Sequence, residues 1–293
     1  MGGMQGREQN SQAKLIRMGT DLPYAGLSAA QKLDIYLPAE GDGPFPVIVS
    51  IHGGAFMFGD KADEQVLPML EGLKRGYAVV SINYRLSGEA KFPALVQDVK
   101  AAIRWVRANA GQWAMDPGRI CAWGGSAGGY LAAMAGVSDG VTGLDDLSLG
   151  NAEESSCVQA VVDWFGPTDF LKMDEQIAAA GLPANPQQAH NGEHSPESLL
   201  LGAVITSIPG KVMTANPETY INANAAPFLI QHGTADDIVP CLQSVYFAQK
   251  LTAVLGPGQV NLDLLDSAKH ADPRFGAAEN LERVFSFLDG ILK

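Results

Sequence analysis

The stretch that decides the fold is Arg119-Ile-Cys-Ala-Trp-Gly-Gly-Ser126-Ala-Gly-Gly-Tyr-Leu-Ala-Ala-Met-Ala135. A short apolar run, typical of a buried strand, leads into Gly-x-Ser-x-Gly, and a helix-prone run follows. In this context of strand, sharp turn and helix, a serine hydroxyl projects from the end of a strand. The turn strains the serine backbone and leaves room only for small neighbours. The stretch therefore predicts an open α/β sheet with Ser126 at the carboxyl end of one strand.

Runs typical of strands alternate with runs typical of helices along the rest of the chain. The apolar runs 46–51 and 77–82 suit strands buried on both faces, whereas the alternating run 32–37 predicts a half-exposed antiparallel edge strand. This alternation predicts a mostly parallel central sheet with helices on both faces. Further strands are expected at 119–123, 158–164, 228–231 and 260–265, and helices at 92–110, 127–135, 242–255 and 277–292.

One segment, residues 168–225, interrupts the alternation and is rich in Ala, Pro, Asn and Gly. Its helical pieces are expected near 174–180 and 198–204. Long excursions from a compact domain commonly serve as lids or binding segments, so we expect a small cap insertion over the site. The length of 293 residues then fits a single α/β domain over 21–293, preceded by a poorly ordered or extended segment 1–20.

Composition limits the classes of partner. A net charge of −12 repels phosphate backbones, which argues against nucleic-acid binding and favours neutral substrates over polyanions. No run approaches the roughly 18 apolar residues of a membrane helix. The first ten residues carry no apolar core of a signal peptide, so a cytoplasmic location is expected, with secretion as the alternative if a signal peptide has been removed. A homodimer stays an open alternative.

The three cysteines are odd in number and are not spaced like metal ligands. We interpret them as buried, reduced thiols. No metal ion and no organic cofactor is expected. The residues concerned are Cys121, Cys157 and Cys241.

The segment His52-Gly-Gly-Ala-Phe56, here called the oxyanion loop, follows the strand that ends at Ile51. Histidine and two glycines in this place are typical of a loop whose successive backbone N–H groups point to one spot. We expect the N–H groups of Gly53, Gly54 and Ala55 to bind a developing oxyanion together with that of Ala127. His52 itself is interpreted as a residue that holds the loop.

A candidate base follows near the end of the chain. His270 lies in the loop between the last expected strand and the last helix. The other histidines are assigned elsewhere: His52 belongs to the oxyanion loop, His232 to a later turn, and His190 and His194 to the expected cap. His270 is therefore preferred as the base that activates Ser126.

The candidate acid is Asp236, in the turn after the strand 227–231. It lies four residues after His232 and four before Pro240, where a carboxylate at a strand's end can face a base. Serine, acid and histidine in this chain order are typical of α/β-hydrolases. The alternatives for the acid are Asp237, Asp163 and Asp169.

Aromatic residues cluster near the same edge of the sheet. Phe56 closes the oxyanion loop, with Met57 and Phe58 behind it, and Trp164 and Phe165 end another strand. Each residue alone would be a core residue, but together they predict an apolar pocket for an acyl or aromatic group. Phe56, Trp164 and Phe165 are the expected substrate-binding residues.

With these features in place, the chain resembles the carboxylesterase branch of the α/β-hydrolases, in particular the bifunctional feruloyl and acetyl-xylan esterase-like proteins. The resemblance covers about residues 30 to 290. Besides the serine turn, it rests on Asn83-Tyr-Arg-Leu86 with Phe92-Pro93, Asp98–Trp105, Asp116-Pro-Gly-Arg-Ile120, Gly166-Pro-Thr-Asp169, Ser195-Pro-Glu-Ser198 and His232–Pro240.

The resemblance implies Ser126 as nucleophile, Asp236 as acid and His270 as base of a serine esterase. It implies neutral acyl esters as substrates, such as acetyl or feruloyl esters of plant carbohydrate. A serine peptidase or amidase of the same fold is the alternative, followed by an inactive hydrolase fold that only binds. The chain departs from the family pattern at Ala55-Phe56, Ala268-Lys269 and 181–194, which bears on substrate choice.

Overall fold

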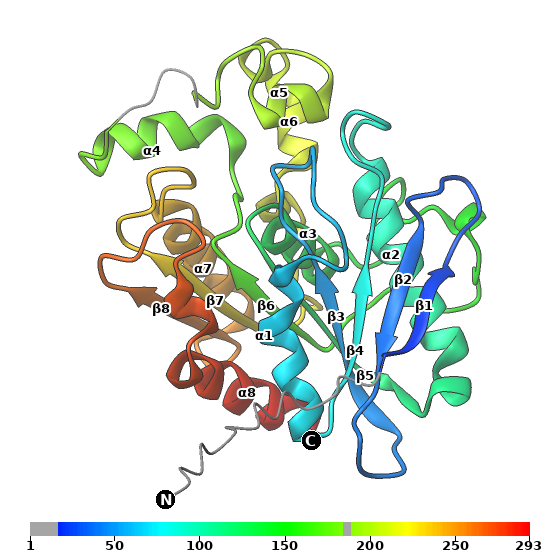
Figure 1. The fold of residues 1–293 in the computed structure, drawn as a ribbon. Helices are drawn as coiled ribbons and strands as arrows, with labels where there is room; N and C mark the ends of the chain where they lie inside the picture. Colours follow the sequence, from blue (N-terminus) through cyan, green and yellow to red (C-terminus); the bar gives the residue numbers. More distant parts are fainter. Residues whose placement is uncertain (1–16, 184–188) are drawn as a thin grey trace, which may run out of the picture.

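A single mixed sheet organises the computed structural model, which describes residues 17–183 and 189–293 (Figure 1). Its strands follow the order β1-β2-β4-β3-β5-β6-β7-β8. The first two strands, β1 (Arg17–Pro23) and β2 (Lys32–Tyr36), are antiparallel, and β2 is also antiparallel to β4 (Ala78–Ile82). The remaining neighbours are parallel: β3 (Phe45–Ile51), β5 (Met115–Gly125), β6 (Ala160–Trp164), β7 (Phe228–Gly233) and β8 (Val260–Leu265). The expectation of a mostly parallel sheet is confirmed.

The position of β2 corrects one expectation. The run 32–37 was expected at an edge, but β1 occupies the edge and β2 lies inside the sheet. Its alternating pattern comes from Asp34, which is fully buried. The Nζ atom of Lys61, itself buried, lies 3.0 Å from a carboxylate oxygen of Asp34. A polar residue in the pattern therefore marks a buried ion pair and not a solvent-exposed face.

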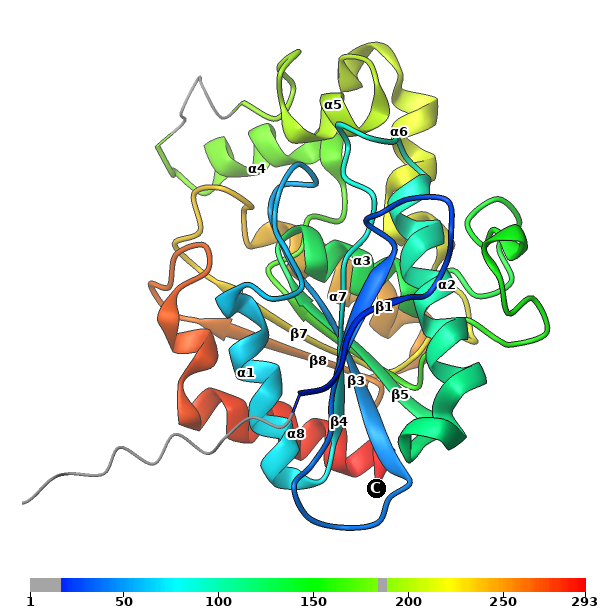
Figure 2. The same ribbon diagram turned by 45° about the vertical axis from the view of Figure 1, so that its right-hand side comes forward.

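Helices cover both faces of the sheet, as expected (Figure 2). Two separate hydrophobic clusters result, and β3 contributes Val47 and Val49 to one and Ile48 to the other. Alternate side chains of a strand point to opposite faces, so a strand buried on both sides reads as a continuous apolar run. One face carries α2 (Ala94–Asn109), α3 (Ala127–Val137) and α7 (Leu242–Leu255), and the other carries α1 (Leu67–Leu70) and α8 (Ala278–Leu292).

Of the segment 168–225, the helices of residues 173–183 and 189–215 lie beyond the carboxyl ends of the parallel strands, at the top of Figure 1. The segment contains α4 (Met173–Ala179) and α5 (Pro196–Leu201), which correspond to the two expected helical pieces. A third helix, α6 (Pro209–Ala215), was not expected. Residues 184–188 of this segment, and residues 1–16 of the expected N-terminal segment, lie outside the described residues.

Candidate active site

Ser126 lies on the turn between β5 and α3, with φ 57° and ψ −121°. Such a backbone conformation is costly for a residue with a side chain, so the surroundings must hold it in place. The helix packs directly on the end of β3: a Cβ atom at Gly128 would lie 2.1 Å from the carbonyl oxygen of Ile51. At Gly124 it would lie 2.6 Å from the same oxygen. The glycines of the motif are therefore required by close packing of the backbone.

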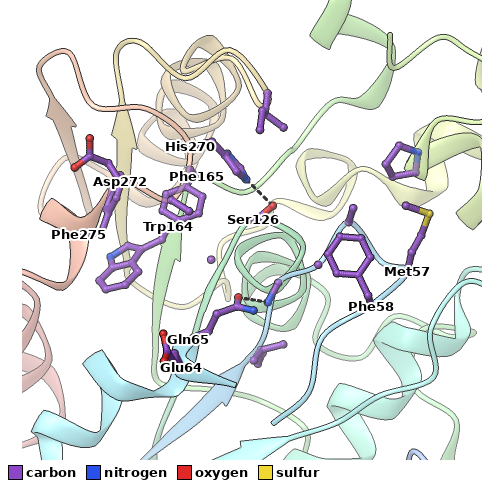
Figure 3. A pocket seen from close by; sticks show the side chains of 18 of the residues that line it. Met57, Phe58, Glu64, Gln65, Ser126, Trp164, Phe165, His270, Asp272 and Phe275 are labelled. Atoms are coloured by element: carbon purple, nitrogen blue, oxygen red, sulfur yellow. Dashed lines mark hydrogen bonds between the residues drawn. The ribbon is translucent and has the colours of Figure 1, made fainter. Parts of the chain in front are cut away.

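The structure brings the three candidate residues of the sequence analysis together. His270 follows β8, and its Nε2 atom lies 3.0 Å from Ser126 Oγ (Figure 3). Its Nδ1 atom lies 2.8 Å from Asp236 Oδ2. The Asp236 side chain is fully buried, whereas 14% of the His270 side chain is exposed. The ring of Phe165 meets the imidazole edge to face, at 4.9 Å between centroids, which restricts its rotation.

Asp236 is held by several donors. Its Oδ1 atom accepts the backbone N–H groups of Ile238 at 3.0 Å and Val239 at 2.9 Å. Burial alone would raise the pKa of Asp236, but hydrogen bonds from His232 and His270 outweigh it and hold that pKa well below its ordinary value. The carboxylate is therefore ionised at neutral pH and can fix the proton on His270 Nδ1.

His232 supports this carboxylate from the protein interior. Its Nε2 atom lies 2.7 Å from the carbonyl oxygen of Val239 and 3.2 Å from Asp236 Oδ2. Since a carbonyl oxygen only accepts, Nε2 carries the proton, and Nδ1 can accept from Ser244 Oγ at 2.6 Å. His232 therefore helps to hold the Asp236 carboxylate, whereas His270 is the histidine that reaches Ser126.

The three alternative acids have other partners. Asp237 faces Lys269, at 3.8 Å, and Asp169 accepts from the side chain of Asn216 at 3.2 Å. Asp163 is fully buried, and its Oδ1 atom accepts the backbone N–H of Gly166 at 3.0 Å. Burial raises the pKa of Asp163 to about 6.

In the oxyanion loop, three successive residues have positive φ: Gly54 at 122°, Ala55 at 51° and Phe56 at 63°. The N–H of Gly53 donates to Gln65 Oε1 at 2.8 Å, so it is not free to face an oxyanion, which corrects the expectation for this residue. Within the described residues, the N–H groups of Gly54 and Ala55 have no acceptor. The N–H of Ala127 opens α3 and has no partner within that helix.

Phe56 also differs from its expected role. It is 1% exposed and packs against the rings of Tyr130 and Phe170, with centroids 5.3 and 5.9 Å away. Its positive φ belongs to a turn that sends this side chain into the core, while Met57 and Phe58 after it line the cavity. Phe56 is therefore an anchor of the oxyanion loop and not a wall of the pocket.

A cavity of about 850 Å³ opens in front of Ser126 and His270. Figure 3 shows Trp164, Phe165 and Phe275 on one side of Ser126, and Met57 and Phe58 on the other. The expected positions of Trp164 and Phe165 in the lining agree with this geometry. The segment expected to form the cap adds a wall made of Ala189, His190, His194, Ser195 and Pro196.

Several lining residues carry no signal in the sequence. Gln65 and Phe275 belong to short 3₁₀ turns, and nothing in their spacing points to the serine. Glu64 and Asp272 bring carboxylates to the lining. Asp272 Oδ1 accepts a hydrogen bond from Arg274 Nε at 2.9 Å.

Within residues 17–183 and 189–293, no group of three His, Cys, Asp or Glu side chains is placed to hold a metal ion. No helix in the same ranges has both the length and the apolar character needed to cross a membrane. The three cysteines are free thiols, as expected, although only Cys121 is fully buried.

Comparison with known proteins agrees with this architecture. The family described as BD-FAE matches residues 33–251. The probable carboxylic ester hydrolase LipM of Mycobacterium tuberculosis is 31% identical over 278 residues, which cover 91% of this chain. The chain spans 61% of the length of LipM.

Two solved structures are similar over most of the chain. A truncated form of a carbohydrate esterase from gut microbiota has a TM-score of 0.80 at 32% identity, covering 92% of this chain and 94% of that one. A bifunctional GH43-CE protein of Bacteroides eggerthii has a TM-score of 0.79 at 36% identity, covering 92% of this chain and 35% of that one. Together with the sheet order and the strand–serine–helix turn, these matches show that the chain belongs to the BD-FAE family and has the α/β-hydrolase fold.

Proposed function

We propose that the chain is a serine carboxylesterase that hydrolyses neutral acyl esters, with Ser126 as nucleophile, His270 as base and Asp236 as acid. One observation carries the proposal: the hydrogen-bonded chain from Ser126 Oγ through His270 to Asp236, at 3.0 and 2.8 Å, beside an apolar cavity. The relatives named above as ester hydrolases and esterases support the same reaction class.

In the first step, His270 Nε2 takes the proton of Ser126 as Oγ attacks the carbonyl carbon. The carbonyl oxygen becomes an oxyanion that faces the N–H groups of Gly54, Ala55 and Ala127. The imidazolium then protonates the leaving alcohol as the ester bond breaks, which leaves an acyl group on Ser126. Ionised Asp236 stabilises the imidazolium and keeps its Nδ1 proton in place.

In the second step, water attacks the acyl group while His270 removes its proton. The second oxyanion uses the same N–H groups. Its collapse breaks the bond to Ser126 Oγ, which recovers its proton from His270 as the acid leaves. The His270 imidazole thus accepts and returns the proton in both steps, and Ser126 ends the reaction in its starting state.

The cavity lining supports neutral substrates. Its walls are mostly apolar, its charged members Glu64 and Asp272 are acidic, and no lysine or arginine occurs among the described lining residues. An apolar lining suits the acetyl and hydroxycinnamoyl groups of carbohydrate esters, and one of the two similar structures is named as a carbohydrate esterase. We place residues 168–225 as the cap that narrows the entrance, since residues 189–196 of it line the cavity.

The test is a substrate panel with the purified chain. It includes p-nitrophenyl acetate, butyrate and octanoate, methyl ferulate, acetylated xylo-oligosaccharides and matched peptide amides. Ester turnover that falls about 10⁴-fold or more in Ser126→Ala supports the proposal. The control is Ser207→Ala, which removes an exposed hydroxyl whose one hydrogen bond within the described part of the chain goes to the Val204 carbonyl. Preference for amides would favour the peptidase alternative, and no turnover of any substrate would favour a binding protein.

A further inference from the structure

We infer that Gln65 is a positioning residue for this reaction, because its Oε1 atom accepts the Gly53 N–H and thereby leaves the N–H groups of Gly54 and Ala55 directed toward the oxyanion. This role rests on the proposed esterase function and extends it. Gln65 belongs to the short 3₁₀ turn Glu64–Val66 and touches the oxyanion loop from outside it.

The contact is direct and crowded. Gln65 Oε1 lies 2.8 Å from the Gly53 nitrogen, and Figure 3 shows the side chain reaching the loop from below Ser126. A Cβ atom at Gly53 would lie 3.0 Å from this Oε1 atom and 2.8 Å from the carbonyl oxygen of Gly125. Gln65, the loop and the serine turn therefore meet at one point.

The hydrogen bonds of two consecutive peptide groups set the orientation of the Gly54 N–H group. In the peptide joining His52 and Gly53, the carbonyl accepts from Tyr84 at 2.9 Å and the N–H donates to Gln65. In the next peptide, the Gly53 carbonyl is 2.8 Å from His52 Nδ1. Since a carbonyl oxygen only accepts, this Nδ1 carries the proton. The Gly54 N–H of that second peptide has no acceptor among the described residues, so it is available to an oxyanion in the cavity.

This fixation matters because the loop is strained. Ala55 and Phe56 both have positive φ, and such residues cost on the order of 1–3 kcal/mol each unless their surroundings hold them. Buried Phe56 anchors one end of the strained turn, and its carbonyl accepts the Ser87 N–H at 2.8 Å. Gln65 anchors the other end, and unlike His52 and Tyr84 it is exposed, so it can be replaced without opening the core.

The test compares Gln65→Leu, which removes the acceptor, with Gln65→Glu, which keeps one. In Gln65→Leu, we expect kcat for p-nitrophenyl acetate to fall about 10- to 100-fold while KM changes less than about 2-fold. The reason is that the oxyanion forms in the transition state and is absent from the bound substrate. Affinity for a trifluoromethyl ketone, whose serine adduct carries an oxyanion, should fall by a similar factor. Gln65→Glu should recover part of both losses.

Gln97→Leu is the matched control, since Gln97 does not line the cavity and, among the described residues, its side-chain amide donates only to the carbonyl of Gly143, at 2.9 Å. Hydrogen exchange of residues 53–56 adds a readout that does not need activity, and it should be faster in Gln65→Leu. If the wild type turns over esters but Gln65→Leu keeps its kcat, or changes only KM, the role of Gln65 is overturned and the esterase stands. If the wild type is inactive, the esterase proposal fails. If, in addition, hydrogen exchange of residues 53–56 is the same in Gln65→Leu as in the wild type, Gln65 does not anchor the loop either.

Discussion

At the scale of single residues, Asp236 offers the sharpest test of the hydrogen-bonded chain. In Asp236→Asn, the amide oxygen can still accept the Ile238 and Val239 N–H groups, so the turn is kept. The amide NH₂ then faces His270 Nδ1 and favours the tautomer with its proton on Nε2, which cannot accept a proton from Ser126. We expect kcat to fall about 10⁴-fold, measured with p-nitrophenyl acetate.

The neighbouring residue supplies the control for this substitution. Asp237→Asn makes the same chemical change one position along, where the carboxylate lies 3.8 Å from the Nζ atom of Lys269. It should keep kcat within about 2-fold of the wild type and leave the thermal midpoint unchanged. Equal losses in the two variants would show that this turn tolerates no substitution, and Asp236 would lose its special role.

Asp163 predicts how stability depends on pH. Burial raises its pKa to about 6 in the folded protein, above its ordinary value of 3.8. Between about pH 4 and pH 6 the folded state therefore binds more protons at this site than the unfolded state, so the site's contribution to stability is lost as pH rises. At 1.36 kcal/mol per unit, the loss is on the order of 2 to 3 kcal/mol.

Asp163→Asn should remove this dependence. The measurement is the free energy of unfolding in urea, at intervals from pH 4 to pH 7, for both proteins. The free energy of unfolding of the variant, minus that of the wild type, should rise from pH 4 to pH 7. A cost of the amide that does not depend on pH shifts this difference by a constant and leaves its rise unchanged. A difference that stays flat with pH would mean that Asp163 is ionised throughout.

The sequence alone predicted that Ser126, Asp236 and His270 lie close together, because each follows a strand and the carboxyl ends of parallel strands meet at one edge of the sheet. It could not identify Gln65, whose role depends on where a short 3₁₀ turn folds back onto residue 53. Phe56 was assigned to the pocket because its neighbours are aromatic, but the handedness of its backbone decides where its side chain goes. The residue types around Phe56 give no sign of this positive φ.

At the scale of elements, long periodic segments were predictable and short ones were not. The helix 242–255 and the strand 260–265 have the expected bounds. The first strand, β1, and the short helix α1 were missed, since a bulged strand and a helix of four residues leave little periodicity. For β2, the pattern was read as exposed because the partner of Asp34, Lys61, lies far along the chain.

The contact between α3 and β3 gives the element-scale prediction. In Gly128→Ala the new methyl group would overlap the carbonyl oxygen of Ile51, so α3 must move away from β3 and carry Ser126 with it. We expect at least about 10²-fold loss of kcat, since an ångström of misplacement can cost this much, and a lower free energy of unfolding. Both are measured on the same preparation.

A glycine in another helix controls for the substitution itself. At Gly290, in α8, an added Cβ meets nothing within 4 Å. Because alanine is the better helix former, Gly290→Ala should gain up to about 1 kcal/mol of stability and keep full activity. If Gly128→Ala behaved in the same way, the close packing of α3 on β3 would not be what fixes the serine turn.

At the scale of the whole molecule, the negative charge acts on the substrate before any contact is made. The chain carries a net charge of −12, and Glu64 and Asp272 add carboxylates to the cavity lining. Such a field lowers the local concentration of anions and leaves neutral molecules unaffected. Salt screens it over a Debye length of about 30 Å at 0.01 M and about 3 Å at 1 M.

Phenyl acetate and 4-carboxyphenyl acetate, which share a skeleton and differ in charge, therefore form a test pair. The ratio of kcat/KM for the anionic ester to that for the neutral ester should rise about 10-fold between 0.01 M and 1 M NaCl, since electronic differences between the two do not depend on salt. Glu64→Gln should make this rise smaller, because it removes a charge at the lining and leaves the distant ones. If both esters responded to salt alike, the field of the protein would have no part in choosing the substrate, and the preference for neutral esters would have to come from the apolar walls alone.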